Sequence, residues 1–518
     1  MWGERLIEGE NPSSLLSSEK SYFEHLSLSL KKYFDLPGKS MSSTFGNRNI
    51  FSMYLCFTIP AAILSIFLVS GITSKSIYFI ILLINMSALV VTRARASWLG
   101  IFLCILIFIY LYRRYLIATV KQNFKKKWLL SATIILLFFV FVSIRLPSFK
   151  GGHKKSVFST IGTISKIWDK DAWSSSVGGY RYQQYESTVR MIKDHLITGV
   201  GIENWRIIYS KYSGYIINDE NYLKLRQRPH NDFLWTTAEV GILGMIAIMV
   251  FFLAHSKLAF KSLNKLKNNA SELQLINTFI IMSFIAIIVE SMFDFPKQRT
   301  MPNLFMWSSL GFLSTQFVEK EKVNEIYGRI IKWVLVLVFG VVSIWAYKDY
   351  KSNIYSQDLR YLKDKQEYNS ALQTGLKALN YGRNVDNTGT PVAFYMGISE
   401  YKLGHRKKAL SLFSDALSIS PYYLGALENY MILSAEEGKL DTAFAYMEKL
   451  QQVYPNYFSP RLNMTKLYMQ SENIPEAMRI LTEVKNGLIN KDQKIYKSVI
   501  KETDRLLSMF TTSQNDEN

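Results

Sequence analysis

Two arginines occupy a short polar turn between apolar segments, at residues 92–100. The guanidinium group can hold a phosphate through two parallel hydrogen bonds. An arginine at the end of a membrane segment is usually an interfacial anchor. Charges held at the end of a helical bundle, however, mark functional sites. Arg93 and Arg95 are therefore candidate functional residues.

A histidine precedes a later apolar segment, within residues 228–235. Asn231 or Asp232 could cap the helix that follows, which would leave His230 without a chemical role. The alternative is a general base near the membrane surface, because imidazole exchanges a proton near neutral pH. Arg228 lies beside it as a candidate substrate-binding residue.

Two further candidates complete the set, of which the second is the weaker. Residues 181–195 predict an amphipathic helix that begins at Arg181 and ends before Gly199 and Gly201. A glycine pair of this kind more often forms a turn than a phosphate-binding loop. Asp294 and Pro296, after another apolar segment, form the second candidate.

Apolar segments must position these residues, and a span needs about 20 apolar residues. The pattern predicts an all-α polytopic bundle of about eight spans. Cys56 and Cys104 lie in these segments and are expected to be small buried hydrophobes. The segments are residues 51–72, 76–91, 98–112, 128–144, 238–254, 275–289, 302–317 and 331–347.

The net charge of +20 is explained best by membrane topology, because inner loops collect Lys and Arg. The short connections 113–127, 256–272 and 318–332 are all basic and fall on one side of an eight-span chain. The long loop 146–237 and residues 348–518 then lie outside. Nucleic-acid binding is disfavoured, because no basic stripe interleaved with aromatics occurs away from the membrane flanks.

The polar C-terminal region repeats at intervals of 34 residues. Small residues recur in one column and large apolar residues in another, and proline closes two units. The pattern resembles tetratricopeptide repeats and predicts a stacked α-solenoid over residues 348–518 with a surface for a protein partner. The columns include Ala409, Ala443, Ala477, Phe413, Met447 and Leu481.

The order of the short motifs resembles the O-antigen ligase superfamily, which also contains O-antigen polymerases and protein O-oligosaccharyltransferases. The resemblance covers roughly residues 43–317. Each motif is short, but their order along the chain is specific as a set. The motifs are Thr-Phe-Gly-Asn-Arg-Asn (44–49), Arg-Ala-Ser-Trp (95–98), Gly-Val-Gly (199–201), His-Asn (230–231), Ala-Glu-Val-Gly (238–241) and Asp-Phe-Pro (294–296).

The resemblance implies a metal-independent, inverting glycosyltransferase without a cofactor, in the bacterial inner membrane. It would move a glycan from undecaprenyl pyrophosphate to lipid A–core on the periplasmic face. Arg95 and Arg181 would hold the donor pyrophosphate, with Arg93 and Arg228 as further substrate-binding residues. His230 would activate the acceptor hydroxyl.

The chain departs from the family pattern at two places. Ala94 and Ala96 replace the serine and glycine that flank the arginine corresponding to Arg95. Fuller members carry several spans before the first motif, whereas residues 1–50 here predict a polar segment. One expectation is therefore that the start of the chain is truncated and that the protein is inactive.

Two alternatives stay open at this point. An O-antigen polymerase or a protein O-oligosaccharyltransferase would use the same donor and site, with a protein acceptor in the second case. A non-catalytic scaffold would use the spans only as an anchor for the repeats. A scaffold has no need for Arg95, Arg181 and His230 together.

Overall fold

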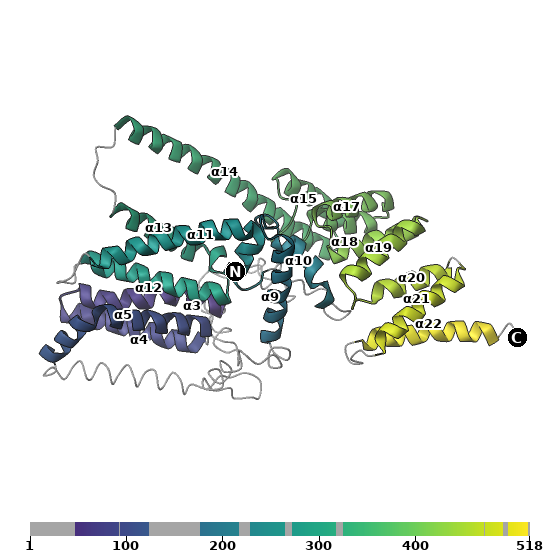
Figure 1. The fold of residues 1–518 in the computed structure, drawn as a ribbon. Coiled ribbons are helices and arrows are strands. Elements are labelled where there is room, and N and C mark those ends of the chain that lie inside the picture. The colour runs from purple at the N-terminus through teal and green to yellow at the C-terminus, as the bar shows by residue number, and fades with distance from the viewer. Residues whose placement is uncertain are drawn as a thin grey trace, which may run out of the picture. The chain divides into compact units, whose positions relative to one another are not determined.

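The structure is a computed structural model whose described residues form helices joined by turns (Figure 1). They divide into two compact units. The first, here called the membrane unit, contains α3, α4, α5, α12, α13, His230–Phe233 and α11 from Ile246 onward. The second, the array unit, contains α9, α10, Leu234–Met245 of α11, and α14 to α22. The structure describes residues 47–92, 94–123, 177–216, 228–264, 272–316, 325–470, 472–489 and 496–515.

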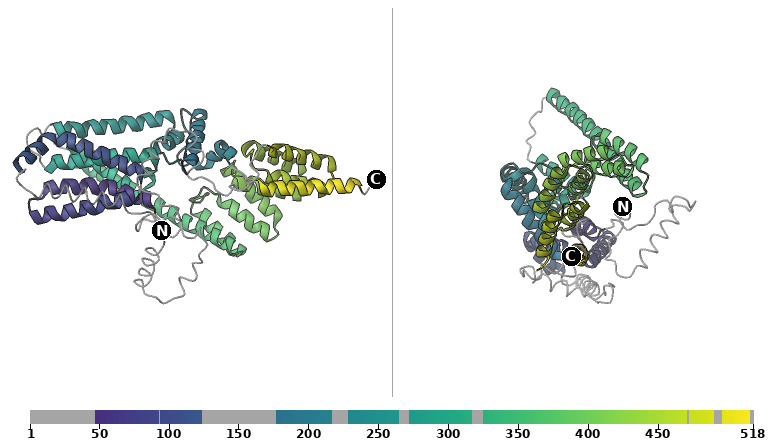
Figure 2. Two further views of the ribbon diagram at one scale, coloured as in Figure 1. Left: turned by 90° about the horizontal axis from the view of Figure 1, so that it is seen from below. Right: turned by 90° about the vertical axis from the view of Figure 1, so that its right-hand side faces the viewer.

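Four helices of the membrane unit lie side by side (Figures 1 and 2). Their shared core is apolar, and Cys56 and Cys104 are buried in it as predicted. Gly100 allows α5 to approach α12 closely, since an added Cβ would lie 3.3 Å from the Cα of Ala286. The helices are α3 (Arg48–Leu68), α4 (Ile72–Thr92), α5 (Arg95–Asn123) and α12 (Glu272–Phe293).

One further helix follows the predicted outer loop, and another follows α12. The first, α11 (Asp232–Asn264), is broken at Gly241, which adopts φ 71° and ψ −178°. The second, α13 (Thr300–Thr315), follows the short 3₁₀ helix η5 (Pro296–Gln298). A β-branched or bulky residue could not adopt the backbone conformation of Gly241 without strain.

Six of the predicted spans fall in helices long and apolar enough to cross a membrane. The predicted segment 128–144 lies outside the described residues. The segment 302–317 forms most of α13, which has 16 residues, just under the usual minimum for a span. The helices support a polytopic membrane protein, and the full number of spans stays a prediction.

The C-terminal part of the array unit starts with α14 (Glu325–Asp364), a helix of 40 residues. Such a helix is about 60 Å long, roughly twice the hydrocarbon thickness of a bilayer. Its apolar side chains between Ile326 and Tyr347 are largely exposed, as expected for a lipid-facing span. Its C-terminal part packs on α15 (Tyr368–Asn380).

Successive helix pairs follow α15 (Figure 2, green to yellow). The columns of the 34-residue pattern are buried, with Ala409, Ala443 and Ala477 each fully inaccessible to solvent. The helices are α16 (Val392–Lys402), α17 (Arg406–Ile419), α18 (Leu424–Glu436), α19 (Leu440–Val453), α20 (Ser459–Gln470), α21 (Ile474–Leu488) and α22 (Lys497–Asn515).

The turn inside each pair uses a left-handed residue at the same point of the period. Gly404 and Gly438 adopt φ +84° and +76°, and Glu472 occupies the third turn with φ +60°. Glycine adopts this conformation without the Cβ penalty, which is why it commonly ends helices. The helical periodicity of the region is therefore real, and its assignment to the tetratricopeptide family stays a prediction.

Candidate functional site

The end of α12 joins three of the sequence motifs within the membrane unit. Nδ1 of His230 lies 3.2 Å from Oδ1 of Asp294. The Nδ2 amide of Asn49 donates to the other carboxylate oxygen of Asp294 at 2.8 Å. Asn47 caps α3 by accepting from the backbone N–H of Asn49, which fixes the position of that residue. Histidine, carboxylate and amide thus form one hydrogen-bonded chain.

This geometry suits a general base. A carboxylate bonded to Nδ1–H leaves the lone pair of the neutral imidazole on Nε2. Asp294 is buried, with 4% of its side chain exposed, whereas 30% of the His230 side chain is exposed. The ring also packs edge-on against Phe295, with centroids 5.1 Å apart. The histidine is therefore oriented from one side while part of its surface remains accessible.

The backbone at His230 is itself unusual. His230 adopts φ +54°, a left-handed conformation that is uncommon for residues other than glycine. The residues that follow it reach the end of α12: the amide of Asn231 donates to the carbonyl of Met292 at 3.0 Å. Asp232 accepts from the backbone N–H of Lys297 at 2.8 Å. These contacts hold a strained residue in place, as is typical of functional sites.

The arginine motif meets the same helix one turn earlier. The hydroxyl of Ser97 donates to the carboxyl of Glu290, which is buried. The backbone N–H of Asp294 in turn donates to the carbonyl of Glu290 at 2.8 Å. Ser97 is two residues from Arg95, the first residue of α5. Arg95 and His230 therefore belong to the same end of the membrane unit.

The turn that carries Arg95 is tightly built. The indole of Trp98 donates to the carbonyl of Leu89 at 2.9 Å, and the hydroxyl of Thr92 donates to that carbonyl at 2.7 Å. The first bond links the start of α5 to the last turn of α4, and the second lies within that turn. Arg93, the other candidate of this motif, lies outside the described residues.

Arg181 and Arg228 belong to the array unit. Arg181 is half-buried in α9 (Val177–Asp194), which confirms the helix predicted over residues 181–195. Arg228 is also half-buried and precedes His230 by two residues. Their use at the same site as His230 and Arg95 stays a prediction.

The Gly-Val-Gly motif is a structural turn. The backbone N–H groups of Val200 and Gly201 donate to the carbonyls of Ala238 and Glu239, each at 2.9 Å. These carbonyls lie where the break at Gly241 interrupts α11, and the turn satisfies them. Both N–H groups are thus bonded to α11, as the turn interpretation requires.

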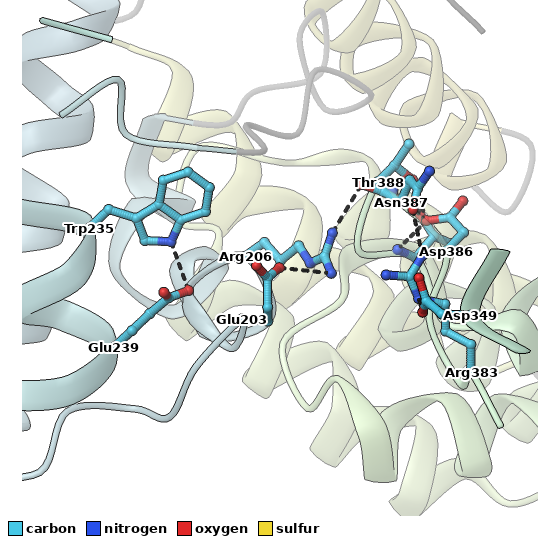
Figure 3. Close-up of polar contacts among 10 residues, drawn as sticks. Glu203, Arg206, Trp235, Glu239, Asp349, Arg383, Asp386, Asn387 and Thr388 are labelled. Atoms are coloured by element: carbon cyan, nitrogen blue, oxygen red, sulfur yellow. Dashed lines mark hydrogen bonds and ion pairs between the residues drawn. The ribbon is translucent and has the colours of Figure 1, made fainter. Parts of the chain in front are cut away.

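The same region is held together by tryptophans. Trp205, at the start of α10 (Trp205–Ser213), is fully buried and donates to the hydroxyl of Thr188 on α9 at 3.2 Å. Its ring lies 6.3 Å from that of Trp235 on α11. The Trp235 indole donates to Glu239 at 2.7 Å (Figure 3). These contacts join α9, α10 and the first turns of α11.

Two residues near His230 were missed by the sequence analysis. Glu290 ends an apolar segment, and an acidic residue at such a position was the available signal. The guanidinium of Arg299 lies 4.8 Å from the Phe295 ring, which also contacts His230. Arg299 follows η5 outside the apolar segments. An arginine beside a membrane span is expected from topology alone, so the residue type did not indicate a functional role.

No group of three or more His, Cys, Asp or Glu side chains suited to a metal ion occurs in the described ranges. The residues around His230 offer an oriented imidazole and, on the other side of Phe295, the guanidinium group of Arg299. Such a set can accept a proton and stabilise an anionic leaving group.

Comparison with known proteins gives one family match: residues 77–249 are similar to the O-antigen ligase family model. The matched stretch includes Arg95, Arg181 and His230, whereas Asn49, Glu290 and Asp294 lie outside it. The match supports the predicted resemblance and, in general, a glycosyltransferase-like function of the O-antigen ligase or polymerase type. No curated protein shows a significant match to the chain.

Proposed function

We propose that the chain is an O-antigen ligase-like glycosyltransferase. It moves a glycan from undecaprenyl pyrophosphate to lipid A–core at the periplasmic face of the bacterial inner membrane. The observation that carries the proposal is the contact between His230 and Asp294, because it orients a base beside the arginine motif. The family match and the six apolar helices support the class and the membrane setting.

In this reaction the acceptor hydroxyl attacks the anomeric carbon of the donor sugar. Nε2 of His230 takes the hydroxyl proton, and Asp294 stabilises the imidazolium that forms. The bond between the anomeric carbon and the pyrophosphate oxygen breaks, and undecaprenyl pyrophosphate leaves. A single displacement inverts the anomeric centre. A positioned base contributes about 10²- to 10⁴-fold to such a rate.

The leaving group gains negative charge and needs fixed cations. We assign this role to Arg95 and Arg181, with Arg93 and Arg228 as further donor contacts. Arg299 adds a cation near His230 through its contact with Phe295. Guanidinium groups suit this task because they remain charged and bind two phosphate oxygens at once. The reaction as proposed uses no metal ion or cofactor.

The arrangement in the membrane follows from the positive charges of the short loops. Residues 51–145 and 238–347 hold the spans, and residues 146–237 form the large periplasmic loop. Residues 348–518 form a periplasmic helical domain.

A lipopolysaccharide gel of a deletion strain beside a complemented strain tests the proposed function. The ligase proposal predicts loss of the whole O-antigen ladder and accumulation of lipid-linked polymer. A ladder reduced to core plus one repeat unit would identify a polymerase. An unchanged ladder with loss of glycosylated proteins would identify a protein O-oligosaccharyltransferase. No change in any glycan would indicate a scaffold.

A further inference from the structure

The short segment after the Gly-Val-Gly turn contacts the helical array of its own chain. This segment, residues 205–216, comprises α10 and the 3₁₀ helix η4 (Gly214–Ile216) and is here called the docking segment. The segment and the residues that it contacts in the following paragraphs belong to the array unit. They involve two separate parts of the array, the turn between α15 and α16 and the end of α19.

The first contact centres on Arg206. Its guanidinium donates to the backbone carbonyl of Asn387 at 3.1 Å and pairs with Glu203 at 3.2 Å (Figure 3). Only 12% of the Arg206 side chain is exposed. Gly389 adopts φ +85° directly beside it, and an added Cβ would lie 3.2 Å from the Arg206 side chain. The long arginine stem is therefore packed against the turn as well as hydrogen-bonded to it.

The turn that binds Arg206 is stabilised by hydrogen bonds among its own residues. The Asp386 carboxylate accepts from the backbone N–H groups of Thr388 and Thr390 at 2.8 and 2.9 Å. Arg383 contacts the side chain of Asn387 and also pairs with Asp349 on α14 at 3.0 Å (Figure 3). The Asn387 carbonyl is thus held in position by the array itself. Such a pre-arranged acceptor binds with less loss of conformational freedom.

The second contact brings two backbones together. Gly214 is buried, and a Cβ added to it would lie 1.7 Å from the carbonyl oxygen of Val453 at the end of α19. The amide of Asn456 donates to the carbonyl of Tyr215 at 2.6 Å. This approach requires glycine, because any side chain would displace the docking segment from α19.

Tyr454 adds a buried hydroxyl to the same contact. Burial raises the pKa of Tyr454, and a hydrogen bond with Ser210 of α10 acts in the opposite direction. The hydroxyl therefore stays protonated and donates to the carbonyl of Tyr422 at 2.5 Å. The end of α19 is in this way bonded both to the array and to the docking segment.

The docking segment is also tied to α9, the helix that carries Arg181. Trp205 donates to Thr188, and the hydroxyl of Tyr212 donates to Asp194 at 2.8 Å. Trp205 and Tyr212 lie at opposite ends of α10, so both ends of that helix are bonded to α9. A displacement of α10 would move α9 with it.

We propose that the helical array binds the docking segment of its own chain and thereby holds α9 in the orientation that presents Arg181 to the donor pyrophosphate. Arg206 and Gly214 are positioning residues in this scheme. The array is joined to the membrane through α14, which continues from its apolar part to the contact with α15. The proposal rests on the proposed function for the identity of the donor.

Hydrogen exchange of the purified full-length protein in nanodiscs tests the docking, with Arg206→Ala and Gly214→Val as the variants. A lost charged hydrogen bond corresponds to about tenfold or more in a local equilibrium. We expect amide exchange in α9 and α10 to rise by about that factor. Arg206→Lys should restore part of the protection, because it keeps a cationic donor. The matched control is Arg479→Ala on α21, which removes exposed ion pairs with Glu476 and Glu483.

A second experiment measures the kinetics of glycan transfer from undecaprenyl pyrophosphate by the wild-type protein and by Arg206→Ala. We expect Arg206→Ala to lower kcat/KM for the donor by about tenfold, because a displaced Arg181 would no longer stabilise the charge that develops on the leaving pyrophosphate. Unchanged kcat/KM in a variant whose α9 exchange has risen would overturn the positioning role. Unchanged exchange in α9 would overturn the docking whatever the activity. Absence of transfer by the wild-type protein would overturn the glycosyltransferase proposal alone, because the exchange measurement needs no substrate.

Discussion

At the scale of single residues, the chemistry depends on contacts between side chains far apart in the sequence. His230 is 64 residues from Asp294, and Asn49 is 245 residues from it. Sequence motifs identified all three as members of one set. They could not show that these residues bond to each other, because a motif carries no distances. The pairing assigns Asp294 the orienting role that the sequence left open.

Replacing Asp294 with asparagine should lower the transfer rate by at least about 10²-fold, because the neutral amide stabilises the imidazolium poorly. Quantitative transfer assays on membranes with equal protein levels would measure this loss. The matched control is Glu400→Gln, which alters the carboxylate paired with His405 at 2.6 Å on the array. Near wild-type activity of Asp294→Asn would show that the carboxylate does not assist His230.

At the scale of elements, the end of α12 places two buried carboxyl groups one turn apart, Glu290 in its last turn and Asp294 directly after it. Glu290 holds Ser97 of the arginine motif, and Asp294 holds His230. Residues four apart share one face of a helix, so a single helix aligns the two motifs. The sequence predicted this helix from its hydrophobicity, but the apolar window ended one residue before Glu290.

Glu290→Ala should destabilise the protein by about 1–3 kcal/mol, since the buried Ser97 hydroxyl loses its acceptor. Glu290→Gln keeps an acceptor oxygen of similar shape and should lose less. Thermal unfolding in detergent, followed by helical circular dichroism, would rank the two variants. Equal stability of the alanine and glutamine variants would contradict a role for this hydrogen bond.

The break in α11 and the Gly-Val-Gly turn depend on one another. An added Cβ at Gly241 would lie 2.0 Å from the carbonyl oxygen of Ile197, and one at Gly199 would lie 2.4 Å from the backbone of Glu239. Both glycines were visible in the sequence. Their mutual contact could not be predicted, because the hydrophobic periodicity of α11 indicates one continuous apolar helix.

Gly241→Ala should therefore cost more stability than Gly404→Ala. Both residues have positive φ, but nothing lies within 4 Å of a Cβ added at Gly404. The control measures the cost of a positive φ, about 1 kcal/mol, whereas the test variant adds a backbone clash and a ψ of −178° that only glycine adopts readily. Thermal unfolding of the two variants gives the comparison. Equal losses would argue against the close approach at Gly241.

At the scale of the whole molecule, hydrophobicity and periodicity predicted most of the architecture. Six apolar helices and the 34-residue helical columns follow from the sequence because each is a local pattern. The contact of the docking segment with the array is not local. It depends on Arg206, on Gly214 and on the hydrogen-bonded turn between α15 and α16. None of these three features is distinguished by residue type in the sequence.

The proposed topology predicts that residues 348–518 are periplasmic. Protease added to intact spheroplasts should degrade an epitope placed at the C-terminus, because the inner membrane would not protect it. A cytoplasmic marker protein in the same sample should remain intact. Protection of the epitope until the membrane is permeabilised would contradict the topology and the periplasmic location of the array.

The most direct test of the account replaces His230 with alanine and measures glycan transfer from undecaprenyl pyrophosphate to lipid A–core by purified protein in nanodiscs. His405→Ala is the matched control, since it also breaks a histidine–carboxylate pair. We predict a loss of about 10²- to 10⁴-fold in kcat for His230→Ala at unchanged donor KM, and no loss for the control. Full transfer activity of His230→Ala would contradict the assignment of the base.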